Sequence, residues 1–304
     1  MITVLSGGTG TPKFLQGLKS VYDSSKINII VNTLENNYFS GVYVAPDIDT
    51  VLYTMSNMIN DETWYGVNGD TFITNERLNE LGTPELLKIG DIDRATKIQK
   101  TLLMENHTLE EAVNIQKSQM KIKSSIIPMS NNASNVKILT DIGELDFHEF
   151  LIEKKGEPNV YGLHFDEVEP SNNLISSIEE SDGIIIGPSN PISSILPIIS
   201  IKGVKKALKN SYVIAISPFI GKEVFSGPAA KFMNALGYES SSIGVGEIYK
   251  DFLDVLYIDN KDQNIKKDLE KIINEVNVSN IYFKNFNDKE NLAKEILNKI
   301  FNKY

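Results

Sequence analysis

The apolar residues along the chain alternate between short continuous runs and longer repeats at helical spacing. Continuous apolar runs occupy residues 2–5, 27–31, 183–186, 212–216 and 255–258. Such runs are typical of parallel strands that are buried on both faces. Because helical patterns separate them, the alternation predicts an α/β fold with a doubly wound, mostly parallel, Rossmann-like sheet.

A change of pattern between about residues 61 and 175 divides the chain. We expect residues 1–60 and 176–304 to form a nucleotide-binding α/β core, and residues 61–175 to form a largely helical insertion. Within the insertion, helices are predicted after the Thr83-Pro84 pair and after Thr108, where Glu111 completes a capping box. The core is predicted to end in an amphipathic helix.

That final helix is indicated by Leu292, Ile296 and Ile300, which recur at helical spacing. Its predicted cap is Asn287, with Glu290 three residues later.

Charge and composition narrow the function classes. The formal net charge of −10 and the pI near 5.0 disfavour a nucleic-acid or membrane-surface partner, because either requires a clustered basic face. The chain has no cysteine, and its three histidines lie far apart in sequence, which disfavours thiolate chemistry and a zinc site. The chain shows neither a secretory signal nor a long uncharged apolar run. We therefore expect a cytoplasmic protein with a small-molecule ligand.

The first candidate for chemistry is the glycine-rich loop LSGGTGTPKF at residues 5–14. It follows a predicted strand and precedes a predicted helix, where backbone N–H groups and the helix N-terminus favour a phosphate. The spacing matches neither the dinucleotide-binding fingerprint nor a P-loop. The alternative is a turn that only packs the strand on the helix. The predicted phosphate-binding residues are Gly7, Gly8, Thr9, Gly10, Thr11 and Lys13.

The second candidate is the segment at residues 31–54, which opens at the carboxyl end of the second predicted strand. Its acidic residues Glu35, Asp47 and Asp49 are of the kind that holds a magnesium ion beside a diphosphate. The alternative is equally favoured: Asp47 caps a helix that begins near Ile48, and Asp49 lies in its first turn.

Two more polar loops follow later strands. The loop at residues 186–195 presents Ser189 and Asn190 between two prolines, either as a further phosphate or base contact or as an ordinary helix cap. The loop at residues 217–233 contains two glycines and two lysines suited to an anionic ligand: Gly221, Lys222, Gly227 and Lys231. Loops that follow strands of a doubly wound sheet converge on one edge, so one nucleotide pocket can use all of them.

Taken together, these segments resemble the 2-phospho-L-lactate transferase family, which acts in coenzyme F-420 biosynthesis. The resemblance covers nearly the whole chain. It rests on LSGGTGTPKFLQGL, VNTLEN, PDIDTVLYT, LLKIGDIDRATKI at residues 86–98, GPSNPISSI, SPFIGKEVFSGPAAKFMNALG and VLYID, in that order.

The resemblance implies transfer of a 2-phospholactyl or enolpyruvyl phosphate group from a guanosine diphosphate carrier. The acceptor is the ribityl hydroxyl of 7,8-didemethyl-8-hydroxy-5-deazariboflavin, and GMP is released. By this resemblance Asp49 and Lys88 bind the deazaflavin, Asp49 is the catalytic residue, and Asp49 with Glu35 binds Mg2+. Asn36 stands where relatives often carry a second acidic residue. A homodimer is expected by the same analogy.

The ligands can then be placed by residue. We assign the guanosine carrier to the glycine-rich loop, Asn32 and the Ser189-Asn190 loop, and the deazaflavin to the region between this edge and Lys88. Three aromatic residues either pack against the deazaflavin or belong to the core: Trp64, Tyr65 and Phe72. The alternative function is that of a nucleotide-sugar-binding regulatory protein of the same superfamily. A dehydrogenase is disfavoured by the missing fingerprint.

Overall fold

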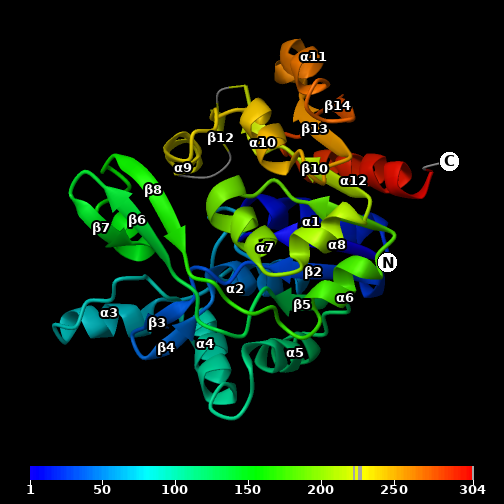
Figure 1. Ribbon diagram of the computed structural model, residues 1–304. Helices are drawn as coiled ribbons and strands as arrows, with labels where there is room; N and C mark the ends of the chain where they lie inside the picture. The colour runs from blue at the N-terminus through cyan, green and yellow to red at the C-terminus, as the bar shows by residue number, and fades with distance from the viewer. Residues whose placement is uncertain (222, 225–227, 303–304) are drawn as a thin grey trace.

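A seven-stranded parallel sheet forms the centre of the computed structural model, which describes residues 1–221, 223–224 and 228–302 (Figure 1). The strand order is β14-β13-β10-β9-β1-β2-β5, and every pairing is parallel. The prediction of a doubly wound α/β sheet is confirmed. The strands are β1 (Ile2–Ser6), β2 (Ile27–Val31), β5 (Ser125–Pro128), β9 (Gly183–Ile186), β10 (Val213–Ile216), β13 (Val255–Asp259) and β14 (Glu275–Ser279).

Alternate residues of these strands point into two separate apolar cores. On β1, Val4 packs on one face of the sheet and Leu5 on the other. The first face is covered by α1 (Gly10–Val21), α2 (Pro46–Met55), α5 (Leu109–Gln119) and α12 (Phe286–Phe301). The second is covered by α6 (Leu174–Glu179), α7 (Leu196–Ser200), α8 (Val204–Lys209), α9 (Ala229–Ala235), α10 (Ser242–Tyr249) and α11 (Lys266–Leu269). Burial on both faces explains the continuous apolar runs.

Strand order reverses between β1 and β9. From β1 the chain moves outward through β2 to β5, and it then returns to β9 and continues through β10 to β13 and β14. The loops after β1 and β9 therefore leave the sheet on opposite sides of one crevice, the position at which open α/β sheets bind ligands.

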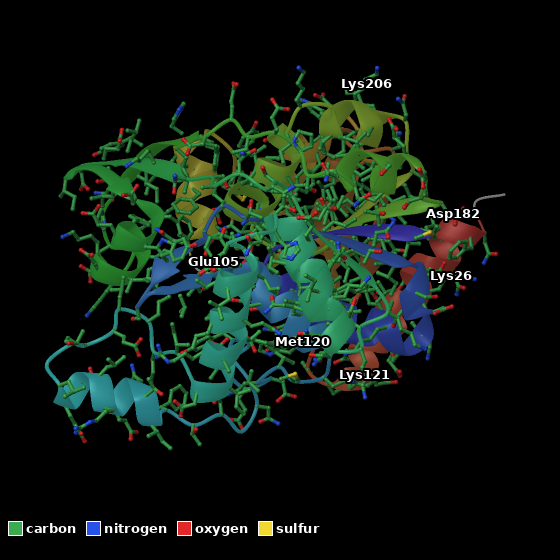
Figure 2. The ribbon with its side chains drawn as sticks, turned by 90° about the horizontal axis from the view of Figure 1, so that it is seen from below. Lys26, Glu105, Met120, Lys121, Asp182 and Lys206 are labelled. Carbon is green, nitrogen blue, oxygen red and sulfur yellow. The ribbon has the colours of Figure 1, made fainter. Side chains whose placement is uncertain are left out.

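The segment predicted as an insertion mixes helices with strands. It contains α3 (Ile73–Glu80), α4 (Asp91–Leu103) and α5, and also an antiparallel sheet of β6 (Val136–Thr140), β7 (Gly143–Asp146) and β8 (Val160–Phe165). It also supplies β5, which pairs with β2 and so belongs to the central sheet. Figures 1 and 2 show α3 standing away from the body of the molecule.

The remaining elements are short. They are the hairpins β3 (Asn37–Phe39) with β4 (Val42–Val44) and β11 (Phe219–Ile220) with β12 (Glu223–Val224), and the helical turns η1 (Ser24–Lys26), η2 (Glu149–Glu153), η3 (Pro191–Ile195) and η4 (Asn260–Ile265). Within the described ranges, no helix combines the length and the apolar character needed to cross a membrane.

One of the three predicted helix starts has the predicted cap. Thr108 caps α5 in a capping box with Glu111, as expected. No helix follows Thr83-Pro84; α4 begins instead at Asp91, where the distant Asp70 carboxylate accepts the N–H groups of Ile92 and Asp93 at 2.8 and 2.9 Å.

The predicted cap of α12 is also wrong by two residues. The capping box is formed by Asn285 with Asp288, because the same pattern of asparagine and acid occurs there, directly before the first helical residue. The amphipathic face of the helix is as predicted, with Leu292, Ile296 and Ile300 buried.

Helices α1 and α12 cross in close contact at Gly17. A Cβ atom at Gly17 would overlap the backbone carbonyl of Lys289, so the crossing requires the absence of a side chain. We expect Gly17→Ala to lower the free energy of unfolding by about 1–3 kcal/mol, since neither backbone can move without disturbing the core.

Denaturant unfolding measures this effect. The control is Lys294→Ala, which places an alanine at an exposed position of α12. A Gly17→Ala protein as stable as the control would contradict the close crossing.

Candidate functional site

A cavity of about 260 Å³ lies at the carboxyl edge of the sheet, between the loops that follow β1 and β9. It is where the reversal of strand order predicts a ligand. The cavity is lined by Gly8, Thr9, Gly10, Glu35, Asp47, Phe147, Leu151, Ser189, Asn190, Ser193, Ser194 and Pro228. The structure thus brings together the predicted residues Gly8, Thr9, Gly10, Glu35, Ser189 and Asn190.

Sequence reasoning missed several members of this lining. Phe147 lies just before η2 and Leu151 lies in it, and both close the cavity from the segment predicted as an insertion. No motif marks these two residues, because their contribution is apolar shape. Ser193 and Ser194 belong to η3, directly after the predicted Ser189-Asn190 loop.

The glycine-rich loop lies against the β9 loop without room for side chains. A Cβ at Gly10 would overlap the carbonyl of Pro188, and one at Gly8 would overlap the Asp47 carboxylate. The Ser189 hydroxyl accepts the Gly7 N–H at 3.1 Å and lies 2.7 Å from the Thr11 hydroxyl. Gly7 and Thr11 therefore hold the loop in place, and Gly8, Thr9 and Gly10 face the cavity.

The N-terminus of α1 opens into the same cavity. Thr9 occupies the N-cap position, but its own side chain does not cap the helix; the Ser189 hydroxyl accepts the Thr11 N–H at 3.4 Å. A helix end of this kind offers backbone N–H donors and partial positive charge to an anion.

Two carboxyl groups, those of Glu35 and Asp47, meet across the cavity. Burial raises the pKa of Asp47 to about 6, although hydrogen bonds from the Asn32 amide at 3.0 Å and from the Gly8 N–H favour the ionised form. Burial together with the neighbouring Asp47 charge raises the pKa of Glu35 well above its ordinary value. When a cation or a proton lies between two like-charged groups in a partly desolvated cavity, it reduces their electrostatic repulsion and stabilises the site.

The predicted nucleotide ligand Asn32 is placed behind Asp47. Besides donating to Asp47, its side chain accepts the Leu34 N–H at 3.2 Å, and it is almost fully buried. Asn32 therefore orients the carboxylate and does not line the cavity.

Asp49 lies in the first turn of α2 and points away from the cavity lining. Its carboxylate pairs with Lys100 and, at 3.1 Å, with Lys97, and it accepts the Ala45 N–H at 3.2 Å. These lysines hold the pKa of Asp49 below its ordinary value, against the opposing effect of burial.

The Asp49 pairs belong to a buried charged cluster between α2 and α4. Lys97 also pairs with Asp93, and Asp93 accepts a hydrogen bond from the Tyr53 hydroxyl at 2.6 Å. Each of these side chains is less than one-tenth exposed. The cluster fixes the first turn of α2, which carries both Asp47 and Asp49.

The other predicted site residues are dispersed. Lys88 is exposed, with its Nζ 4.2 Å from the centre of the Phe72 ring, and its carbonyl accepts the Tyr65 hydroxyl at 3.0 Å. Lys13 points toward Trp64, 5.2 Å from its ring centre, and lines a different cavity.

The loops at residues 186–195 and 217–233 contribute unequally to the cavity. Asn190 caps η3, accepting the N–H groups of Ile192 and Ser193 at 3.0 and 3.2 Å, while it also lines the cavity. Lys231 donates to the backbone carbonyl of Glu157 at 2.8 Å. Lys222 and Gly227 lie outside the described residues.

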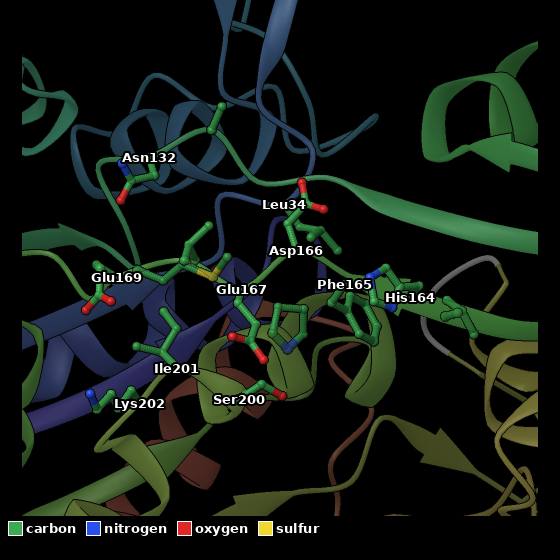
Figure 3. Close-up of a pocket in the computed structure, with 15 residues that line it drawn as sticks. Leu34, Asn132, His164, Phe165, Asp166, Glu167, Glu169, Ser200, Ile201 and Lys202 are labelled. Carbon is green, nitrogen blue, oxygen red and sulfur yellow. The ribbon is translucent and has the colours of Figure 1, made fainter.

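A larger cavity of about 1100 Å³ shares no lining residue with the first (Figure 3). The two are neighbours along the chain, since Leu34 lines the larger cavity and Glu35 the smaller, and α7 lines the larger directly after η3 lines the smaller. Three acidic side chains lie around it: Asp166, Glu167 and Glu169. Across the described part of the chain, no three acidic or histidine side chains group as a metal site would.

Comparison with known proteins gives a match over almost the full chain. A family model described as "2-phospho-L-lactate transferase CofD" matches residues 2–297. A 2-phospho-L-lactate transferase of Methanothermobacter thermautotrophicus is 55% identical over 300 residues, covering 99% of this chain and 98% of the relative. Enzymes of the same name from Methanococcus maripaludis and Methanocaldococcus jannaschii are 48% and 46% identical, each covering 97% or more of both chains.

Solved structures share the fold at low identity. A member of the upf0052 family from Bacillus halodurans superimposes with a TM-score of 0.67 at 15% identity, covering 97% of this chain and 98% of that one. At this identity the likeness concerns the fold alone.

The raised pKa of Asp47 predicts how stability depends on pH. Its carboxyl ionises near 3.8 in the unfolded chain and near 6 in the folded protein, so the folded state binds more protons between these values. The free energy of unfolding without divalent cations should therefore fall as the pH rises through this window. The Asp47→Asn variant has no carboxyl at this position, so its free energy of unfolding does not fall for this reason. We expect the substitution to raise the melting temperature at pH 7 by roughly 3 °C or more.

Thermal unfolding between pH 4.5 and 7.5 in a chelating buffer measures this difference. Glu62→Gln is the control, since it removes one negative charge from an exposed position. Equal melting temperatures for Asp47→Asn and the wild type at every pH would show that burial of Asp47 is not unfavourable.

Proposed function

We propose a site for the reaction of this chain, which belongs to the 2-phospho-L-lactate transferase family and is a 2-phospho-L-lactate transferase of coenzyme F-420 biosynthesis. The observation that carries the proposal is the cavity in which the glycine-rich loop, the N-terminus of α1 and two carboxyl groups meet. It combines donors for a diphosphate with acidic groups suited to a cation that neutralises it.

The diphosphate of a guanosine carrier lies in this proposal against Gly8, Thr9 and Gly10. Their backbone, which lines the cavity, and the N-terminus of α1 supply hydrogen bonds and positive potential to the phosphate oxygens. Ser189 contributes indirectly, because its hydroxyl holds the loop at Gly7 and Thr11.

The residues present fit a magnesium ion. Mg2+ usually takes one or two carboxylates and completes its shell with water and substrate phosphates. Glu35 and Asp47 form such a pair; burial raises the pKa of both groups, and the Asp47 charge raises the pKa of Glu35 further. A bound Mg2+ would neutralise charge on the diphosphate as GMP departs.

Asp47 thus takes, in this proposal, the place that the sequence suggested for Asp49 beside Glu35. Asp49 keeps its importance as a positioning residue. Its ion pairs with Lys97 and Lys100 fix the helical turn from which Asp47 reaches the cavity.

The chain's contribution to the chemistry is alignment. The ribityl hydroxyl oxygen forms a bond to the phosphorus that carries the lactyl or enolpyruvyl group. The bond from that phosphorus to the bridging oxygen breaks, and GMP leaves with the electron pair. The hydroxyl proton passes to solvent. Transfer of this kind depends on positioning and charge neutralisation, so no covalent nucleophile is required.

The deazaflavin acceptor is proposed to lie beside Lys88. The exposed Lys88 ammonium over the Phe72 ring, with Tyr65 bonded to the same loop, offers an aromatic and cationic surface for a planar acceptor. The guanosine is proposed to lie in the cavity of about 1100 Å³, where carboxylates such as Glu167 suit the N–H donors of a guanine.

The alternative is a nucleotide-sugar-binding regulatory protein of the same superfamily. Fluorescence titration with the deazaflavin, with and without GDP and Mg2+, separates the two. Saturable binding that responds to GDP supports the proposed site, whereas binding of a nucleotide sugar alone supports the alternative. The predicted homodimer is tested by the mass of the protein in solution.

Two variants test the assignment of Asp47. We expect Asp47→Asn to lower kcat at least about a hundredfold, because one of the two carboxylates facing the diphosphate is lost. Turnover by this variant should also respond more weakly to added Mg2+. Steady-state transfer assays over a range of Mg2+ measure this. Glu62→Gln is the control, and near-normal turnover by Asp47→Asn would remove Asp47 from the site.

A third variant tests the acceptor region. Lys88→Ala should raise the KM for the deazaflavin about tenfold, since it loses one cationic contact, with little change in the KM for the guanosine donor. Equal effects on both substrates would show that Lys88 does not separate the two sub-sites.

A further inference from the structure

A separate pocket lies between the first turns of α1 and α12, and it shares no residue with the glycine-loop cavity. Its volume is about 320 Å³. Three lysines line it, Lys13, Lys284 and Lys289, together with the aromatic residues Trp64, Phe283 and Phe286. The lining of this pocket is positively charged, whereas the chain as a whole has a net charge of −10.

Two of the lysines converge on one indole ring. The Nζ atoms of Lys13 and Lys289 lie 5.2 and 4.7 Å from the centre of the Trp64 ring. Burial lowers the pKa of both lysines, and for Lys289 the charge of Lys13 lowers it further, while Asp61 acts in the opposite sense. Two partly desolvated ammonium groups that repel each other favour an anion placed between them.

Little within the protein neutralises these lysines. Lys289 donates to the Gln16 side chain at 2.7 Å, a neutral acceptor. Among the described residues, no carboxylate lies within ion-pair distance of Lys13 or Lys289, although Asp61 is part of the lining. The pocket therefore keeps an excess of positive charge.

Trp64 is held in an unfavourable backbone conformation. Its φ of 58° lies in the left-handed region, which is rare for a bulky side chain. The surrounding turn maintains it, since the Trp64 N–H donates to Asn60 at 2.8 Å and the turn is closed by pairing of Ile59 with Val67. Strain of this kind is retained where the position of a side chain matters.

We propose that this pocket binds a small organic phosphate that carries an aromatic ring. The phosphate lies between Lys13 and Lys289, and the ring packs among Trp64, Phe283 and Phe286. Ammonium groups pair with the phosphate charge, and aromatic side chains favour a ring of the ligand over a bare ion.

Trp64 is the only tryptophan of the chain and lines this pocket, so its fluorescence reports on a ligand bound there. The probes are phenyl phosphate, inorganic phosphate and phenol, titrated into the full-length protein. We expect a saturable change in Trp64 emission with phenyl phosphate, at least about tenfold tighter than with either fragment, because only the whole molecule uses both the lysines and the rings.

Matched variants locate the response. Lys289→Gln should weaken phenyl phosphate binding about tenfold, since a charged contact is lost, and Lys294→Gln, on the exposed side of the same helix, should leave it unchanged. Ser189→Ala, which disturbs the glycine-rich loop, should also leave it unchanged. Transfer activity is measured in parallel, so a failure of the proposed function is seen separately.

Three results would overturn the proposal. They are the absence of a saturable response in the wild-type protein, equal binding by Lys289→Gln and Lys294→Gln, and loss of the response in Ser189→Ala. The last would place the phosphate at the glycine-loop cavity.

Discussion

The site depends on the contact between two loops that follow neighbouring strands of the sheet. The loop after β1 lies directly on the loop after β9, so closely that a Cβ atom at Gly10 would overlap the Pro188 carbonyl. Ser189 joins the loops through Gly7 and Thr11, and this leaves the intervening backbone turned toward the cavity. The reversal of strand order between β1 and β9 makes this contact geometrically available, and the glycines make it sterically possible.

A second constraint is the separation of charge along α2. Asp47 and Asp49 are two residues apart in one helical turn, so their side chains point in very different directions. Asp49 turns toward α4 and is neutralised by Lys97 and Lys100. Asp47 turns toward the glycine-rich loop and Glu35, and among the described residues it forms no ion pair. The buried ion pairs therefore stabilise the helix turn, and we propose that the Glu35 and Asp47 carboxyl pair serves the ligand.

Much of this arrangement could be predicted from the sequence, for identifiable reasons. The central strands are buried on both faces and therefore appear as unbroken apolar runs, and the glycine-rich loop is marked by its place between strand and helix. The strand β14 was not predicted, because it lies at the edge of the sheet and only Val276 in it is fully buried. The strand β5 was missed because it lies within a segment of helical pattern and has only four residues.

The side chains at the site were harder to predict than the backbone around them. Nothing in the spacing PDID shows which of the two aspartates faces the cavity, because that depends on Lys97 and Lys100, which lie about fifty positions further along the chain. The same holds for Lys13, which follows the glycine-rich loop in sequence and yet points to Trp64, on the α12 side of α1. A helix that begins at a ligand turns successive side chains away from it within one turn. Membership of a phosphate-binding motif therefore identifies the backbone that meets the phosphate, and the partners of each side chain decide whether that side chain does.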